Sequence, residues 1–441
     1  MKLNYRRTFL VGLAFLSISA FWQMYDGVIP KILTGTFGIG ETVSGGIMAI
    51  DNVLALFLLP FFGSLSDKSN TRIGRRMPFV QFGTIGAVLL MLILPLIDNS
   101  YAATPAPWKL IIFIIVLGLL LITMGTYRSP AVALMPDVTP KPLRSKGNAV
   151  INLMGAGGGI LYLIVSSVLY SKKRIGDVEH VNYLPLFAIV AGIMAVAVLI
   201  LRLTINEPKL VAQAKQYDTI DEKPKGRPTD NQKLPKPVVK SLVFLLISVF
   251  LWFFGYNGIT TWFTTFAGQA WGMALGDASL CLTIATAGAI VSYIPIGQLS
   301  AKIGRKRSIL LGTAILAGCF AAAYLYTLYA SRFSPLLYVI FVLVGFSWAA
   351  ISVNSLPMVV EMCHLSDVGR FTGYYYTFSM AAQTITPIAA GALLENVSYK
   401  VLFLYSALFV AASFVTMLFV HHGDTAIETK KSLLENFDVE D

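Results

Sequence analysis

Twelve runs of mostly apolar residues, each close to the length of a membrane-spanning helix, dominate this 441-residue sequence. A bilayer core is about 30 Å thick, so a helix needs roughly 20 apolar residues to cross it. Only 13% of the residues are charged, whereas soluble domains carry about 25%. We therefore predict an all-α integral membrane protein with twelve transmembrane helices. The expected spans are 8–30, 42–65, 77–97, 110–135, 147–170, 183–204, 241–267, 278–300, 308–330, 335–360, 371–394 and 399–420.

The first span follows Lys2, Arg6 and Arg7, as the apolar part of a signal peptide does. It runs past the usual 7–15-residue length of such a segment, and it carries Trp22 and Asp26 without a convincing cleavage site. We expect it to remain in the protein as a helix.

Positive charges are distributed unevenly over the loops that separate the spans. Most of the 34 Lys and Arg residues lie in loops on the same side as the N-terminus. The positive-inside rule then places both termini in the cytoplasm of a multi-pass protein, for which we expect the cell membrane. The net charge of +11 reflects orientation in the lipid bilayer, and we expect no nucleic-acid partner.

The spans divide into two groups of six. We expect an N-terminal six-helix bundle over 1–205, a cytoplasmic linker over 206–240, a C-terminal six-helix bundle over 241–420 and a cytoplasmic tail over 421–441. The linker is rich in proline and mixed charge, which is typical of a flexible segment. His421 and His422 fit ordinary interfacial residues better than metal ligands. The three scattered cysteines have no CxxC spacing, and we expect neither a metal site nor a cofactor.

The two halves repeat each other. The loop Gly63-Ser-Leu-Ser-Asp-Lys, followed by Arg-Ile-Gly-Arg-Arg76, matches Gly297-Gln-Leu-Ser-Ala-Lys-Ile-Gly-Arg-Lys-Arg307. Spans 1 and 7 share Tyr25-Asp-Gly-Val28 and Tyr256-Asn-Gly-Ile259. Duplicated halves with a binding site between them are a transporter architecture.

These motifs resemble those of the major facilitator superfamily. Tyr127-Arg-Ser-Pro130 and Ala133-Leu-Met-Pro-Asp137 make the sequence similar to the sucrose-transporter and glycoside–pentoside–hexuronide:cation symporter branch. The resemblance implies two pseudo-symmetric halves that rock around a central site, with charged loop residues closing the cytoplasmic side.

The sequence departs from that branch at several positions. Ala55 and Leu59 stand where melibiose-type members carry sodium-site carboxylates, and Leu121 stands where plant sucrose carriers have a carboxylate in span 4. In the second copy of the repeated loop, Ala301 stands where the first copy has Asp67. The resemblance therefore does not imply sodium coupling of the melibiose type, nor sucrose as the solute.

Few charges lie deep within the expected spans. Asp26, Asp51 and Arg128 do so, and such groups usually face a cavity or a partner. Asp26 is the strongest candidate for proton coupling, and its repeat counterpart is the neutral Asn257. Asp51 is a second candidate for ion coupling, and Arg128 either binds an anionic group or neutralises an aspartate. The alternative is a structural Asp–Arg pair that holds helices together.

Aromatic and amide side chains lie near these charges or in the matching region of the second half. Such groups suit neutral polyols, whose CH faces stack on rings while their hydroxyls form hydrogen bonds. For Asn152 on span 5, packing is the competing interpretation. The candidate solute-binding residues are Trp22, Gln23, Tyr25, Asp26, Arg128, Asn152, Trp252, Tyr256, Asn257, Trp348, Asn354, Tyr375 and Gln383.

Charged residues at the cytoplasmic ends of the spans are candidates for a gate of ion pairs, as the resemblance implies. They are Asp67, Arg75, Arg76, Asp137, Arg144, Glu361 and Arg370.

We therefore predict a secondary active transporter that moves a small-molecule solute, a sugar or glycoside, together with a proton or monovalent cation. We expect a monomer and no enzymatic activity, because no catalytic motif is present. An exporter of amphipathic compounds by proton antiport is one alternative, and a non-transporting membrane receptor is another.

Overall fold

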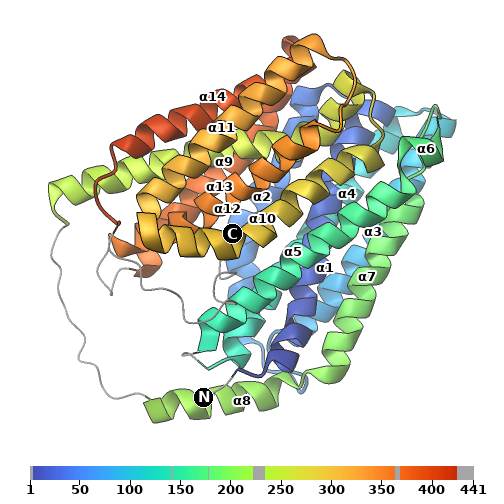
Figure 1. Cartoon of the computed structure of the whole chain (residues 1–441). Helices are drawn as coiled ribbons and strands as arrows, with labels where there is room; N and C mark the ends of the chain where they lie inside the picture. The colour runs from blue at the N-terminus through green and yellow to red at the C-terminus, as the bar shows by residue number, and fades with distance from the viewer. Residues whose placement is uncertain (1–2, 141–142, 177, 222–233, 363–367, 425–441) are drawn as a thin grey trace. The chain divides into compact units, whose positions relative to one another are not determined.

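We describe a computed structural model that covers residues 3–140, 143–176, 178–221, 234–362 and 368–424. Contacts divide the chain into two compact units: Met1–Ile39 with Ile50–Pro224, and Gly40–Ala49 with Lys225–Asp441. Figure 1 follows the chain through both units.

The first unit is a helical bundle. Within it, α1 packs against α5 and α7, and α3 packs against α4 and α7. Its helices are α1 (Tyr5–Lys31), η1 (Ile32–Thr36), α2 (Glu41–Lys68, of which the unit takes Ile50 onward), α3 (Met77–Ala103), α4 (Pro107–Val138), α5 (Arg144–Leu169), α6 (Lys172–Ile175), α7 (Leu184–Thr204) and α8 (Glu207–Asp221).

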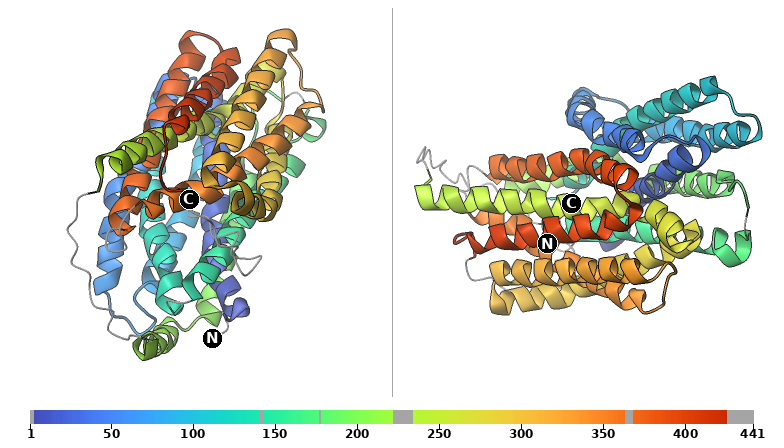
Figure 2. Two further views of the ribbon diagram at one scale, coloured as in Figure 1. Left: turned by 60° about the vertical axis from the view of Figure 1, so that its left-hand side comes forward. Right: turned by 90° about the horizontal axis from the view of Figure 1, so that it is seen from above.

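The second unit is also helical, and α9 and α14 run side by side in both views of Figure 2. In addition, α10 and α11 pack against α12, and α13 packs against α9. Its helices are α9 (Lys236–Trp271), α10 (Leu275–Ile303), α11 (Arg305–Tyr329), α12 (Leu337–Glu361), α13 (Val368–Asn396), η3 (Tyr399–Val401) and α14 (Leu402–Leu418).

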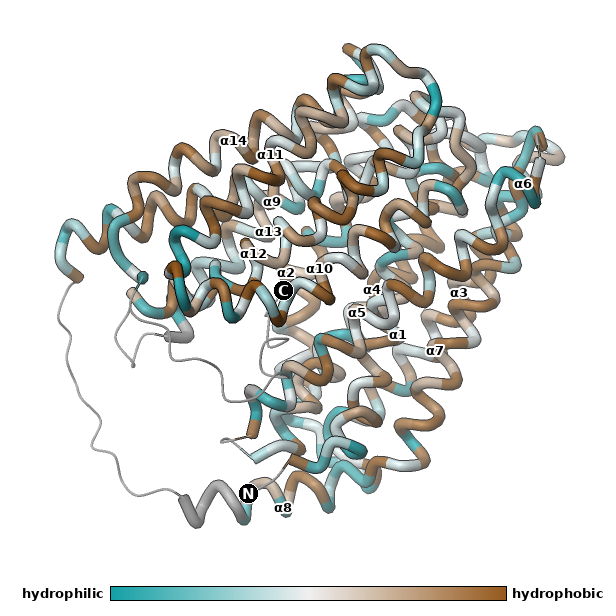
Figure 3. The backbone as a smooth tube through the Cα atoms, viewed as in Figure 1, coloured by the Kyte–Doolittle hydropathy of each residue, from teal (hydrophilic) through white to brown (hydrophobic). Residues whose placement is uncertain are grey.

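The twelve predicted spans are confirmed as helices. In the part of the chain that is described, twelve helices are long and apolar enough to cross a membrane. They carry outward-facing apolar side chains, such as Phe82 and Val291, which are 72% and 74% exposed. In Figure 3 these helices are mainly brown and white along their lengths, whereas the short α6 is teal. An apolar outer surface is what lipid requires.

The segment expected to be a flexible linker is partly helical, which corrects that prediction for its first part. Residues 207–221 form α8, and Glu207 at its start is only 1% exposed. The prolines that suggested a linker all follow this helix, apart from Pro208 in its first turn, where proline is tolerated. Residues 222–233 and the predicted tail from 425 lie outside the described residues.

Helices α1 and α5 approach each other closely in the first unit. A Cβ atom on Gly158 would lie 2.0 Å from the backbone oxygen of Leu16, so only glycine fits there. Gly155 and Gly159 lie near Ser19 and Gln23 of α1, as expected for small residues at a packed interface.

The start of α2 belongs with the second unit. The backbone N–H of Thr42 donates to Glu395 Oε2 at 2.8 Å, and the hydroxyl of Tyr399 donates to Glu41. One continuous helix is therefore divided between the units, with the boundary between Ala49 and Ile50.

Candidate functional site

The charges predicted to couple ions lie together in the first unit. The guanidinium carbon of Arg128, on α4, lies 5.6 Å from the ring centre of Trp22 on α1, a cation–π contact. Asp51, on α2, lies within electrostatic range of both Arg128 and Asp26. The structure thus gathers two acids, one cation and an indole from three helices.

Asp51 has a defined hydrogen-bond donor. Asn52 Nδ2 donates to Asp51 Oδ1 at 2.9 Å, and Arg128 supplies the nearby positive charge. Asp26 has the second carboxylate, Asp51, as a neighbour and is half-buried. Of the two acids, Asp51 therefore has the environment that better stabilises a charge.

Within each unit, some buried polar atoms have no hydrogen-bond partner among the described residues. They include Trp22 Nε1 and the Tyr25 hydroxyl in the first unit, and Asn257 Nδ2 in the second. Tyr25 and Asn257 belong to the repeated Tyr-Asp/Asn-Gly motif. Because buried polar groups in proteins are normally bonded, these atoms are suited to bind water or a solute.

Aromatic rings form a platform in the second unit. Tyr256 on α9 and Trp348 on α12 stack with centroids 3.8 Å apart and planes only 8° from parallel. Phe253 meets Trp348 edge-on at 5.4 Å. Tyr256 and Trp348 remain partly exposed, so a flat CH-rich solute can be placed against this platform.

Three of the predicted solute-binding residues have contacts that packing explains. Asn354 is 2% exposed, and its Nδ2 donates to Ser300 Oγ and to the Ala350 carbonyl, each at 2.9 Å. The Tyr375 hydroxyl pairs with Ser355 Oγ at 3.0 Å, and Trp252 is fully buried. Gln23, Asn152 and Gln383 are only partly buried.

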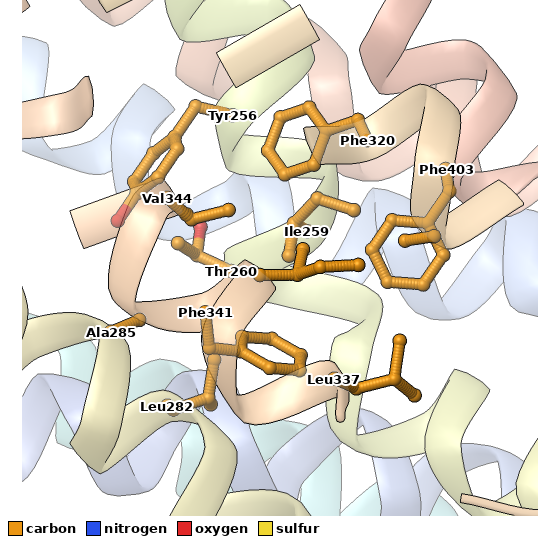
Figure 4. A pocket seen from close by; sticks show the side chains of 12 residues that line it. Tyr256, Ile259, Thr260, Leu282, Ala285, Phe320, Leu337, Phe341, Val344 and Phe403 are labelled. Atoms are coloured by element: carbon orange, nitrogen blue, oxygen red, sulfur yellow. The ribbon is translucent and has the colours of Figure 1, made fainter. Parts of the chain in front are cut away.

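The cavity in Figure 4 is not large enough for a solute. It lies in the second unit beside Tyr256, has a volume of about 20 Å³ and is lined mainly by apolar side chains such as Phe320, Phe341 and Phe403. A single water occupies roughly this much space, and apolar cavities of such size stay dry.

Four of the five predicted gate residues of the first unit form one network. The guanidinium of Arg76 pairs with Asp67 and, through Nε at 2.9 Å, with Asp137. Arg75 reaches the same Asp137 oxygen at 3.1 Å. Asp137 therefore joins the end of α4 to the loop before α3.

The second unit has a simpler version of this network. Arg305 pairs with Glu361, one of the predicted gate residues. Arg305 itself was not among the residues predicted from the sequence. Its signal was present, because Arg305 follows Gly304 as Arg75 follows Gly74 in the repeat. Arg370 lies over the ring of Phe371, and Arg144 Nε donates to the Thr139 carbonyl at 3.3 Å.

Sequence reasoning also missed two acids that lie beyond the last span of each half. Glu207 accepts hydrogen bonds from the backbone N–H groups of Arg75, Arg76 and Met77 at 2.8 to 3.1 Å. Asp424 accepts one from the Arg305 N–H at 2.7 Å. Each carboxylate thus lies at the start of the third helix of its half, where negative charge is favoured.

The backbone next to each acid requires glycine. Gly74 has φ +123° and Gly304 has φ +93°. A Cβ on Gly74 would lie 2.0 Å from the Glu207 carboxylate, and one on Gly304 would lie 2.9 Å from that of Asp424. Glycine at positions 74 and 304 therefore allows both the positive-φ turn and the close approach of the carboxylate.

Twelve spanning helices in two related sets, with charges and unpaired polar groups inside the spans, define a multi-pass transport protein. The family model described as Major Facilitator Superfamily matches residues 11–276 and 265–435. The chain belongs to this superfamily.

Curated relatives are similar over parts of their length. The chain is 29% identical over 196 residues to an alpha-ketoglutarate permease of Escherichia coli, which is 43% of this chain and 41% of that protein. It is 30% identical over 155 residues to the proton-associated sugar transporter A of Mus musculus, 34% of this chain and 20% of that one. A sucrose transport protein of Arabidopsis thaliana is 30% identical over 138 residues, 29% of this chain and 23% of that protein. The matched part is thus less than half of each relative.

Solved structures share the fold. The inward-open xylose transporter of E. coli aligns over 98% of both chains with a TM-score of 0.67 and 15% identity. A bacterial homologue of the iron transporter ferroportin aligns over 95% of this chain and 99% of that one, with a TM-score of 0.68 and 13% identity.

Proposed function

We propose that this transporter moves a sugar or glycoside by alternating access and couples that movement to protons. The single observation that carries the proposal is the cluster of Asp26, Asp51, Arg128 and Trp22. The cluster places the carboxylates of Asp26 and Asp51, from two different spans, close to each other. In such a setting a proton can be taken up and released as the site opens to one side of the membrane and then to the other.

The stacked rings of Tyr256 and Trp348 support a sugar as the solute. Similarity to relatives whose names include sugar and sucrose transport agrees with this choice. In our proposal Trp22, Gln23, Tyr25, Asn152, Asn257 and Gln383 supply the remaining polar contacts, whereas Asn354, Tyr375 and Trp252 support the helices around them.

We also propose a monomer in the cell membrane with both termini in the cytoplasm. The excess of Lys and Arg in loops on the side of the N-terminus supports this orientation. The networks of Asp137 and Glu361 then lie at the cytoplasmic ends of the spans, where their ion pairs would form and break during transport.

The experiment is transport by purified protein in liposomes under an imposed pH gradient, with radiolabelled xylose, glucose, sucrose and maltose as probes. We expect accumulation of one sugar by the native protein. Asp26→Asn should abolish accumulation but retain exchange of labelled for unlabelled sugar, because exchange needs no net proton movement. Asp98→Asn is the matched control, since Asp98 is a fully buried aspartate on α3 beside His180.

Two results would contradict the proposal. Accumulation by Asp26→Asn that equals the native level would remove the coupling role. Transport of tetraphenylphosphonium against the proton gradient, with no response to any of the sugars, would favour the exporter of amphipathic compounds.

A further inference from the structure

A separate cavity lies in the second unit, where the start of α9 meets the residues that follow α14. It has a volume of about 270 Å³ and is lined by Pro237, Lys240, Ser241, Phe419, His421 and His422. We call it the basal cavity. None of the proposed solute-binding residues lines it.

Hydrogen bonds order the floor of the basal cavity. Ser241 is 2% exposed, and its Oγ accepts from the backbone N–H of His421 at 3.1 Å and pairs with His422 Nδ1 at 2.8 Å. The pairing of Nδ1 orients the His422 ring and leaves Nε2 as its second polar atom.

The charge of the basal cavity is positive. No described acid forms an ion pair with Lys240 or His421, the two most exposed basic groups of the lining. Asp424 follows His421 and His422 closely in the sequence. Its carboxylate accepts a hydrogen bond from the Arg305 N–H at 2.7 Å and lies against Gly304. Lys306, close by, donates to the Leu418 carbonyl at 3.0 Å.

The cavity also lies at the end of a membrane span. α9 has 36 residues, many more than the roughly 20 needed to cross the bilayer core, and Lys240 stands just before its apolar stretch. Val239 and Phe419 are 41% and 49% exposed beside the basic groups. A basic group next to exposed apolar side chains is typical of a helix end at the bilayer surface.

We propose that the basal cavity binds a phosphate group, with Lys240 as the charged donor and His421 and His422 as additional donors. Two sources can present this group: the headgroup of an anionic phospholipid and free inorganic phosphate. The exposed Phe419 and Val239 would contact acyl chains only in the first case.

The test uses full-length protein purified in detergent, then supplied with phosphatidylglycerol, with phosphatidylcholine or with inorganic phosphate. Native mass spectrometry measures the retained lipid, and thermal unfolding measures the response to phosphate. The variants are Lys240→Gln and His421→Gln, singly and combined. Lys236→Gln is the matched control, because this exposed lysine is one turn earlier on α9 and does not line the cavity.

We expect phosphatidylglycerol to be retained in preference to phosphatidylcholine. Retention should fall roughly five-fold for each basic group removed. His421→Lys, which keeps a basic group at this position, should retain binding. A thermal shift with inorganic phosphate alone would identify the free anion as a sufficient ligand.

Equal retention of both lipids together with no thermal shift from phosphate would overturn the proposal. An equal loss in Lys236→Gln and in the combined variant would do the same, because it would reduce the effect to surface charge. Since Lys240 and His421 are both exposed, all variants should fold, and unfolding in lipid-free detergent checks this.

Discussion

The carboxylate of Glu207 holds the first turn of α3 by accepting a hydrogen bond from the backbone N–H of Arg76 at 2.9 Å. Arg76 is the same residue whose side chain pairs with Asp67 and Asp137. The backbone and the side chain of one arginine are thus fixed by acids from three different parts of the chain. This arrangement makes the ion-pair network of Arg76 depend on α8.

Removing the carboxylate at position 207 should destabilise the first unit. We expect Glu207→Gln to lower the free energy of unfolding by about 1–3 kcal/mol, because three backbone N–H groups lose a charged acceptor and the helix loses a favourable charge. Thermal unfolding in detergent measures the effect. Glu179→Gln, at an exposed acid, serves as the control and should change nothing.

The two acids that pair with Arg76 should differ in importance. Asp137 is 21% exposed and Asp67 is 57% exposed. We expect Asp137→Asn to lower the free energy of unfolding by about 1–3 kcal/mol, because Arg75 also loses its ion-pair partner. We expect Asp67→Asn to lower it by less than about 1 kcal/mol, because water screens that pair. Urea-induced unfolding followed by tryptophan fluorescence compares them. Equal effects of the two substitutions would argue against a central role of Asp137.

Two adjacent glycines of α5 provide a test of helix packing. Gly158→Ala places a methyl group against the Leu16 backbone oxygen, so we expect a loss of about 1–3 kcal/mol. Gly157 has no neighbouring atom within 4 Å, and Gly157→Ala should be neutral or stabilise the helix by up to about 1 kcal/mol. Thermal unfolding of the pair separates packing from helix propensity. A destabilised Gly157→Ala would show that propensity is not the deciding factor at that position.

The aromatic platform should affect solute affinity more than stability. We expect Trp348→Leu to raise the sugar concentration for half-maximal transport by roughly ten-fold, since a ring face contributes about 1 kcal/mol or more to such a contact. Initial rates of exchange in liposomes measure this. Phe250→Leu removes another stacked ring of α9, which contacts Phe254, and should leave the half-saturating concentration unchanged.

The spans could be predicted because the bilayer imposes a single length and a single polarity on each of them. The Arg75–Arg76–Asp137 network was also predictable, since its residues stand at repeated positions next to span ends. Glu207 could not be found in this way. Its carboxylate accepts hydrogen bonds from backbone amides about 130 residues earlier, and such a long-range contact leaves no local pattern in the sequence. In addition, the prolines that follow α8 suggested a flexible segment where Glu207 begins a helix.

The same difficulty applies to the inside of the bundles. Asn354 and Gln383 look alike in sequence as amides in apolar helices, yet Asn354 is bonded to Ser300 while Gln383 is half-exposed. Only the neighbouring helix decides which amide is used for packing. Prediction of the individual solute contacts therefore required the contacts between helices, which hydropathy and periodicity do not contain.

The acids that follow the last span of each half also have a consequence for biosynthesis. Ribosomes complete α3 and α11 long before they reach Glu207 and Asp424, which stand 130 and 119 residues beyond the amides they bind. The start of α3 and the start of α11 are thus each capped by an acid that is synthesised after the last spanning helix of its half. A chain that ends before Glu207 would therefore contain all six spanning helices of the first half but lack the carboxylate that caps the start of α3.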